Sequence, residues 1–179
     1  FYAFGGMIVT VIIQSSAATL ALTITALSTG QLIYLDALAI AVGANIGTAT
    51  TAAIGAMVSN ANSKRMALGL FIFKGIVGFI TLVLLYFIMD IVDYIANTLD
   101  ISPDNWGMKL AVFHTFFNLV GLIIFSFFIP RLVLFLKKQF VAEVGDYIQK
   151  PKYLDMEVVA VPFVALKATR KETIHLYDN

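Results

Sequence analysis

The stretch Gln14-Ser15-Ser16-Ala17-Ala18-Thr19 places an amide and three hydroxyls inside sequence that is otherwise apolar. A second polar stretch, Gly43-Ala44-Asn45-Ile46-Gly47-Thr48-Ala49-Thr50-Thr51, follows the apolar run Ala37–Val42. Unpaired polar groups in hydrocarbon cost several kcal/mol each, so such groups face protein, water or a ligand. We call these stretches the first patch (14–19) and the second patch (43–51). Together they predict an all-α polytopic membrane protein whose helices enclose a polar interior.

The composition of the rest of the chain agrees with a membrane protein. Hydrophobic residues make up 60% of the sequence and charged residues only 13%, against roughly a quarter in soluble domains. The mean hydropathy is +0.90. There is no cysteine, which excludes a disulfide scaffold and a thiolate metal site. A net charge of +1, with no basic stripe before the C-terminal end, argues against a nucleic-acid partner.

The first hydrophobic unit covers residues 1–30 and has the first patch near its centre. A continuous span needs about 20 apolar residues, so the unit is long enough to cross a bilayer. One alternative is a straight helix in which Ser and Thr bond to their own backbone and pack against neighbours. The other is a bent hairpin that enters the membrane partway. The glycines of the second patch favour the bent alternative.

The second patch also allows two interpretations. Gly43 and Gly47 stand four residues apart, which is typical of a tightly packed membrane helix. That interpretation explains the glycines but neither Asn45 nor the threonine cluster at 48–51. We therefore expect the helix over Ala37–Met57 to be interrupted at Gly43–Thr48. Interrupted helices of secondary transporters present N–H groups to an anion, and carbonyls to a cation, near the middle of the membrane.

Two further spans follow, over Met66–Met89 and Leu110–Ile129, and we expect them to belong to long helices over roughly 64–98 and 107–138. Lys74 lies nine residues beyond Arg65, which is about 13 Å of helix rise. A charge at that depth either snorkels to the interface or faces an anionic ligand or a carboxylate. We favour snorkelling.

His114 and Asn118 stand four residues apart and therefore share one face of the later span. His114 is either a packing residue with its polar atoms satisfied or, with Asn118, part of a polar contact that supports the two patches. The sequence leaves both alternatives open.

The distribution of charge predicts the orientation. The loop at Lys64-Arg65 and the segment after Pro130 are basic, whereas the connector over residues 90–109 is acidic. Because cytoplasmic loops collect Lys and Arg, we expect a multi-pass protein of the inner (plasma) membrane with a cytoplasmic C-terminus.

The C-terminal part differs in character from the membrane part. Residues 131–138 are basic and amphipathic, as in a helix that lies along a membrane surface. Small apolar residues at 158, 161, 164, 165 and 168 recur at helical spacing. We therefore divide the chain into a membrane domain, residues 1–140, and a cytoplasmic linker with one helix, residues 141–179.

A resemblance to a known family rests on three motifs. Gln14-Ser15-Ser16 followed by Gly43-Ala44-Asn45-Ile46-Gly47-Thr48 resembles the paired signature of the type II sodium/phosphate cotransporter family. Phe113-His114-Thr115-Phe116-Phe117-Asn118 resembles the histidine–phenylalanine–asparagine helix near the end of that family's membrane part. Ala17 and Ala49 depart from it, because the family usually has serine and threonine there. The segment after Pro151 resembles the linker into a PhoU-like regulatory domain, of which only the first helix is expected here.

The resemblance implies a function and a set of residues. The function is sodium-dependent symport of inorganic phosphate by alternating access, with sodium as coupling ion, no other cofactor and no enzymatic activity. The implied binding residues are Gln14, Ser15, Ser16, Thr19, Asn45, Gly47, Thr48, Thr50 and Thr51. Of these, sodium is expected at Gln14, Ser15, Ser16, Asn45 and Thr48, with Lys74, His114 and Asn118 as supporting residues. The residues by themselves indicate only a small anion and a hard cation.

Two other functions remain as alternatives: a structural or regulatory membrane subunit without transport, and an anion or cation channel. An intramembrane enzyme is not favoured, because the sequence has no nucleophile motif, phosphate loop or carboxylate pair. The family builds its site from two inverted repeats, and this chain has one set of motifs. Because Phe1 is no natural start, we expect a fragment that pairs with a missing first repeat, or else with a second copy.

Overall fold

The computed structural model describes residues 1–140, 152–153 and 162–177. All regular structure in these ranges is helical, with eight helices and no strand, which confirms the all-α fold class. Contacts divide the chain after Val141 into two units. The helices of the first unit are α1 (Tyr2–Ile13), α2 (Ser16–Ser28), α3 (Tyr34–Ala56), α4 (Ala61–Val83), α5 (Leu85–Thr98), α6 (Trp106–Ser126) and α7 (Ile129–Gln139). The second unit contains α9 (Pro162–Tyr177).

Helices α1 and α2 form a hairpin that turns at the first patch. Gln14 adopts a left-handed conformation with φ 60°, and its N–H donates to the carbonyl of Thr10 at 2.7 Å. Ser15 is the N-cap of α2, and its Oγ accepts from the N–H of Ala18 at 3.2 Å. The bent alternative is therefore confirmed. With 12 and 13 residues, neither arm is long enough to cross a bilayer.

Helix α3 runs without a break through the second patch, so the interruption predicted at Gly43–Thr48 is wrong. The glycines permit close helix packing instead. A Cβ on Gly43 would lie 1.7 Å from the carbonyl oxygen of Ala3, and one on Gly47 would lie 2.7 Å from that of Met7. The interpretation as a tightly packed small-residue helix is the correct one for these glycines.

The threonines of the second patch also fit a continuous helix. Each hydroxyl donates to a carbonyl of α3 itself: Thr48 to Ala44, Thr50 to Ile46, and Thr51 to Gly47 and Thr48. Such bonds satisfy a hydroxyl at membrane depth without unwinding the backbone.

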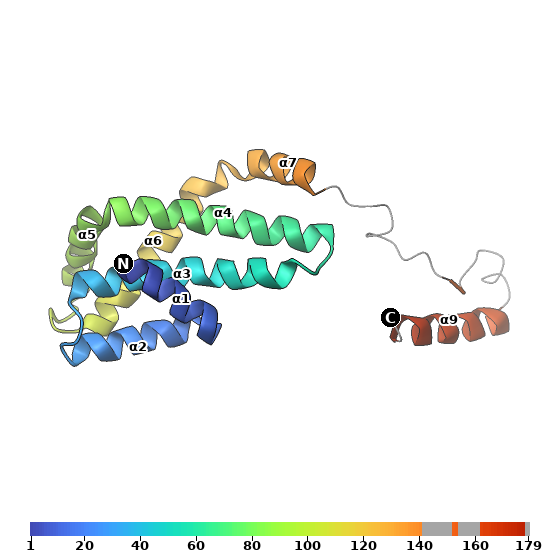
Figure 1. Cartoon of the computed structure of the whole chain (residues 1–179), viewed down its shortest axis with the longest axis horizontal. Helices are drawn as coiled ribbons and strands as arrows, with labels where there is room; N and C mark the ends of the chain where they lie inside the picture. Colours follow the sequence, from blue (N-terminus) through green and yellow to red (C-terminus); the bar gives the residue numbers. More distant parts are fainter. Residues whose placement is uncertain (141–151, 154–161, 178–179) are drawn as a thin grey trace. The chain divides into compact units, whose positions relative to one another are not determined.

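Helix α3 is central to the first unit. The α1–α2 hairpin packs against it, and α4 and α6 also contact it; in Figure 1, α2 and α4 run along opposite sides of α3. The buried core contains the large side chains Leu38, Val42, Val77, Leu110, Phe113 and Phe117. Nine residues of α3 are buried, more than in any other described helix.

Three described helices, α3, α4 and α6, are long and apolar enough to cross a membrane. The longer helices expected over 64–98 and 107–138 are each divided in two. Leu84 separates α4 from α5, and nothing in the local sequence marks that bend. Phe127 and Phe128 separate α6 from α7, whose first turn contains Pro130. Proline fits there because the first N–H groups of a helix have no partner within it.

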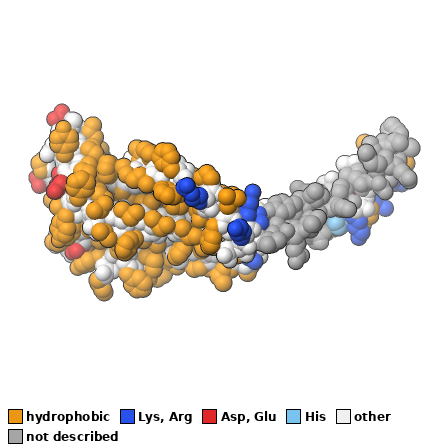
Figure 2. Space-filling model, turned by 90° about the horizontal axis from the view of Figure 1, so that it is seen from above, with side chains coloured by type: hydrophobic (Ala, Val, Ile, Leu, Met, Phe, Trp, Pro, Cys, Tyr) orange, Lys and Arg blue, Asp and Glu red, His pale blue; other side chains and the backbone are white. Residues whose placement is uncertain are grey.

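The surface of the first unit is that of a membrane protein. Large apolar side chains are exposed along the spanning helices, among them Phe71, Ile76, Phe79 and Ile80 on α4 and Leu119, Leu122, Ile123 and Ile124 on α6. Figure 2 shows hydrophobic side chains over most of the visible face, acidic ones gathered at one end and basic ones towards the other. This pattern suits a bilayer with polar headgroups at both ends.

In the second unit, α9 contains part of the helix expected over Asp155–His175. The N–H of Tyr153 donates to Glu172 Oε2 at 2.7 Å, and His175 Nδ1 lies 3.6 Å from Glu172 Oε1. The bond from the Tyr153 N–H is the main reason why the pKa of Glu172 is lowered. The predicted linker at 144–151 and the first turns of the expected helix, residues 155–161, lie outside the described residues.

The close approach of α1 and α3 yields a stability prediction. We expect Gly43→Ala to destabilise the full-length protein by about 1–3 kcal/mol, because the new methyl group overlaps the backbone of α1. Gly55→Ala is the matched control on the same helix, since nothing lies within 4 Å of its Cβ position. That control should be neutral or stabilising by up to roughly 1 kcal/mol. Thermal unfolding in detergent measures both, and equal melting temperatures would contradict the packing argument.

Candidate functional site

Asn45 lies at the centre of a hydrogen-bond network between three helices. The residue is buried, with 4% of its surface exposed. Lys74 Nζ, from α4, donates to Asn45 Oδ1 at 2.6 Å, and Asn45 Nδ2 donates to Asn118 Oδ1, on α6, at 3.0 Å. Asn118 Nδ2 in turn donates to the carbonyl oxygen of His114 at 2.8 Å. We call Lys74, Asn45 and Asn118 the Asn45 network.

The position of Lys74 does not match the favoured expectation. Its ammonium reaches a buried residue in the middle of α3, so the snorkelling prediction is wrong. The salt bridges of the described residues are Lys109–Asp93 and His175–Glu172, and neither involves Lys74. Lys74 therefore faces the helix bundle, and within the described part of the chain its partner is a neutral amide.

The two polar residues of α6 have different surroundings. Asn118 makes a polar contact with Asn45 of the second patch, which is one of the two alternatives left open for the pair His114 and Asn118. His114 packs its ring edge-on against Phe117, with centroids 5.4 Å apart. Its Nδ1 is buried and has no hydrogen-bond partner among the described residues. His114 is thus both a packing residue and a source of unused hydrogen-bonding capacity.

A second polar contact holds the α1–α2 hairpin together. Thr10 and Thr19 are 0% and 2% exposed, and Thr10 Oγ1 donates to Thr19 Oγ1 at 2.9 Å. Thr19 Oγ1 donates to the carbonyl oxygen of Ser15 at 3.1 Å. Thr10 was not among the predicted site residues, although its hydroxyl interrupts an apolar run, the same signal that singled out the first patch.

The tip of the hairpin presents the remaining residues of the first patch. Gln14 is exposed, and Ser15 and Ser16 are partly exposed at the N-terminal end of α2. The first turn of a helix offers N–H groups without a partner in the helix and a positive dipole end, and both favour an anion. At the end of α1 the Thr10 carbonyl accepts from the Gln14 N–H, and the carbonyls after it have no partner within the helix. Carbonyl oxygens suit a hard cation.

The structure therefore places the predicted site residues in two groups: the first patch on the α1–α2 hairpin, and the second patch with the Asn45 network on α3, α4 and α6. Gly47 packs against α1, where a Cβ would meet that of Thr10 at 2.8 Å, so the two patches are neighbours through packing. No hydrogen bond between described residues joins one patch to the other. Thr48, Thr50 and Thr51 use their hydroxyl protons within α3. The Asn45 oxygen already faces an ammonium group, which opposes a second cation there.

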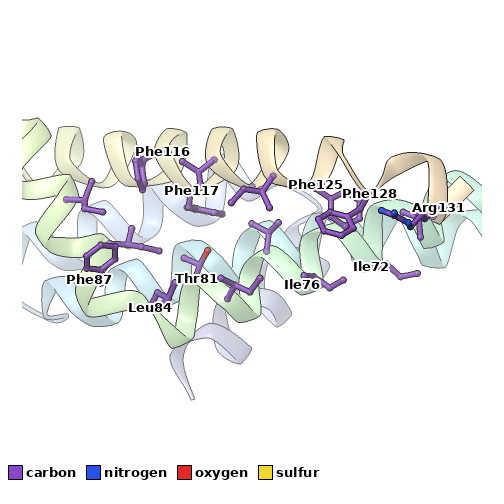
Figure 3. A pocket seen from close by; sticks show the side chains of 18 residues that line it. Ile72, Ile76, Thr81, Leu84, Phe87, Phe116, Phe117, Phe125, Phe128 and Arg131 are labelled. Carbon is purple, nitrogen blue, oxygen red and sulfur yellow. The ribbon is translucent and has the colours of Figure 1, made fainter.

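An apolar groove of about 710 Å³ lies between α4, α5, α6 and the start of α7. Figure 3 shows its side chains: apart from Thr81 and Arg131, the labelled ones are aliphatic or aromatic. None of the predicted site residues lines it. A small oxyanion needs several donors, so this groove does not suit one.

Comparison with known proteins identifies the relatives of this chain. The family model described as Na+/Pi-cotransporter matches residues 2–99. The "Putative inorganic phosphate export protein YjbB" of Escherichia coli (strain K12) is 30% identical over 174 residues, which cover 97% of this chain and 31% of the relative. The proteins of that name from Shigella flexneri and Salmonella typhimurium match with the same identity and coverage. The chain thus spans about a third of the length of these relatives. No solved structure matches it.

The Thr10–Thr19 contact yields a prediction for the hairpin. In a double-mutant cycle of Thr10→Val and Thr19→Val, we expect a coupling energy of about 0.5–1.5 kcal/mol, because each change alone breaks the same buried hydrogen bond. Thermal unfolding of the full-length protein in detergent measures the cycle. Thr25→Val is the control: its exposed hydroxyl bonds only within α2, and the change should cost less than about 0.5 kcal/mol. Strictly additive effects of Thr10→Val and Thr19→Val would show that the hydroxyls do not interact.

Proposed function

The chain belongs to the Na+/Pi-cotransporter family, and on that basis we propose that it is part of a transporter that moves inorganic phosphate across the inner (plasma) membrane by sodium-dependent symport. Transport proceeds by alternating access around the hairpin tip. The curated relatives, named for phosphate export, support phosphate as the substrate.

The observation that supports this function best is the break between α1 and α2. A helix break at membrane depth leaves backbone groups that must find a partner. Here the break brings the amide of Gln14 and the hydroxyls of Ser15 and Ser16 to the free end of α2. Each serine hydroxyl can donate one hydrogen bond to a phosphate oxygen while it accepts another. Phosphate binds at the α2 end, where N–H groups and hydroxyls converge.

Sodium binds at the same break in this proposal. Its ligands are the side-chain oxygens of Gln14, Ser15 and Ser16 together with free carbonyls at the end of α1, all of them oxygen donors. A cation beside the phosphate offsets the charge of the anion, so each ion favours the binding of the other. The Asn45 oxygen is not part of this sodium site, because Lys74 already donates to it.

The proposed topology follows the charges at the two ends of the first unit. The start of α4 and the end of α7 contain basic residues, and α5 and the loop after it contain acidic ones. By the positive-inside rule the basic end is cytoplasmic. Residues 1–140 then form one membrane repeat, which pairs with the first repeat of the same protein or with a second copy of this chain. Residues 141–179 form a cytoplasmic linker and the first helix of a PhoU-like domain.

The direction of transport needs its own measurement. A sodium gradient directed inwards favours uptake by a symporter, whereas the names of the relatives indicate export. A symporter is reversible, so the gradients determine the direction of net flux. Flux of labelled phosphate into right-side-out and inside-out vesicles, with and without sodium, distinguishes the two directions.

The serines at the hairpin tip give the test of this function. We expect Ser15→Ala and Ser16→Ala each to lose about 1.5–3 kcal/mol of phosphate binding, since each removes a hydrogen bond to a charged ligand. That loss corresponds to a roughly ten- to hundredfold higher KM in sodium-dependent uptake by the full-length protein. Ser28→Ala is the matched control on α2, because its hydroxyl is exposed and bonds to Ile24 of its own helix.

Different results would contradict the assigned binding site and the proposed function. Sodium-dependent uptake that is equal in Ser15→Ala, Ser16→Ala and wild type would show that the hairpin tip is not the binding site. Absence of any phosphate flux in wild-type vesicles, in either orientation, would contradict the function itself.

A further inference from the structure

Lys74 has an unusual position for a charged residue. It is in the middle of α4, a 23-residue helix apolar enough to span a membrane. Its side chain is directed to the buried Asn45 rather than to an end of the helix. A charged side chain at this depth is costly, and such residues commonly face a partner or an ion pathway.

The described partners of Lys74 do not neutralise its charge. Asn45 Oδ1 accepts one hydrogen bond from the ammonium group, which has three N–H donors. An amide oxygen carries only a partial charge. Among residues 1–140, 152–153 and 162–177, no carboxylate lies within ion-pair distance of Lys74. Lys109, which is buried in the membrane unit, does have such a partner, since Asp93 lies 2.6 Å from its Nζ, whereas Lys74 is half-buried and has none among the described residues.

The surrounding helices hold the ammonium group in place. Asn45 is fixed by Asn118, whose amide is fixed in turn by the carbonyl of His114. Three helices therefore contribute to the position of one charge. A lysine that only filled space would not need one buried and one partly buried amide, on two other helices, to orient it.

A second donor borders the Asn45 network. His114 lies one turn before Asn118 on α6, and its carbonyl oxygen accepts from Asn118 Nδ2 at 2.8 Å. Its Nδ1 is buried and has no hydrogen-bond partner in the described part of the chain. An ammonium with unused N–H groups and an imidazole nitrogen that can donate are the groups that an oxyanion requires.

From these contacts we propose that Lys74 binds the phosphate oxyanion directly during transport, with His114 as a second donor and Asn45 as the residue that positions Lys74. The inference rests on the proposed function and deepens it, because it assigns the positive charge that selects an anion. It also changes the role of Asn45 from a ligand of sodium or phosphate to a positioning residue.

Equilibrium binding of labelled inorganic phosphate to the purified full-length protein tests the proposal. We expect Lys74→Gln to weaken binding roughly ten- to hundredfold, as for the loss of a hydrogen bond from a charged group. Lys74→Arg keeps the charge and should retain most of the affinity. Lys137→Gln is the control for net charge, since Lys137 is exposed on α7 and its replacement should leave the affinity unchanged.

A change at Asn45 separates anion binding from a merely structural contact. Asn45→Asp places a carboxylate beside the Lys74 ammonium in nearly the same shape. A charged pair with Lys74 then replaces the charge–amide contact, but the bond from Asn45 Nδ2 to Asn118 Oδ1 is lost, so thermal unfolding of the variant is measured alongside binding. Phosphate affinity should nevertheless fall about as far as in Lys74→Gln, since the carboxylate neutralises the ammonium and repels the anion. Unchanged affinity in Asn45→Asp would overturn the positioning role.

A chemical rescue completes the test. The sequence contains no cysteine, so Lys74→Cys can be made in a cysteine-free form of the full-length protein. Aminoethylation of that cysteine through a disulfide restores a cationic side chain, and methylthiolation adds a neutral one. Only the cationic adduct should recover phosphate binding.

Each outcome bears on the proposal. Wild-type affinity in Lys74→Gln, or equal recovery with both adducts, overturns the inference and leaves the proposed function intact. Failure of the wild-type protein to bind phosphate overturns both. Loss of affinity in Lys74→Gln with recovery by the cationic adduct alone supports the inference.

Discussion

The close approach of α1 to α3 is the contact on which the rest of the first unit depends. The two arms of the α1–α2 hairpin are too short to cross a bilayer, and their polar tip is unstable in lipid. The hairpin is therefore stable at depth only where protein covers it. Gly6, Gly43 and Gly47 allow backbone to touch backbone, because a Cβ at any of them would overlap the opposite helix. Van der Waals contact over this surface replaces the driving force that water supplies to soluble helix pairs.

The same stretch of α3 has a second face, which presents the polar side chain of Asn45 to α4 and α6. A helix turns by about 100° per residue, so residues four apart share a face and a residue two positions away lies nearly opposite. Gly43 and Gly47 therefore face α1, and Asn45, halfway between them, faces α4 and α6. The pattern glycine-x-asparagine-x-glycine thus combines a packing surface with a polar centre. An unwound backbone is not needed to present either.

This geometry explains which expectations were correct. The break at Gln14–Ser15 was expected because of the glycines of the second patch, although these lie in an unbroken helix. The local signal for the break is a polar patch with a strong N-cap residue, Ser15, inside an apolar run. The glycines of α3 were consistent with both unwinding and close packing, and only the partner helix distinguishes the two. Lys74 posed a similar problem: its partner Asn45 is 29 residues away in sequence, and depth alone fits snorkelling as well as an inward contact. Thr10 was missed because a single hydroxyl in a helix usually bonds to its own backbone.

The Asn45 network implies different positions for the fixed cation, the Lys74 ammonium, and for the mobile cation, sodium. An ammonium 2.6 Å from Asn45 Oδ1 makes that oxygen unfavourable for sodium, because two cations within a few ångströms repel strongly where water is scarce. The oxygen atoms of the α1–α2 break face no such charge in the described structure, so a mobile cation is better placed there. A fixed cation on α4 and a mobile one at the hairpin together match the negative charge of a phosphate ion. Only the mobile cation varies with the sodium gradient, so Lys74 can contribute to anion affinity but not to coupling. In this arrangement the fixed positive charge for the anion is on α4, whereas the hairpin tip contacts both ions, so a change at Lys74 can weaken anion binding and leave the dependence on sodium intact.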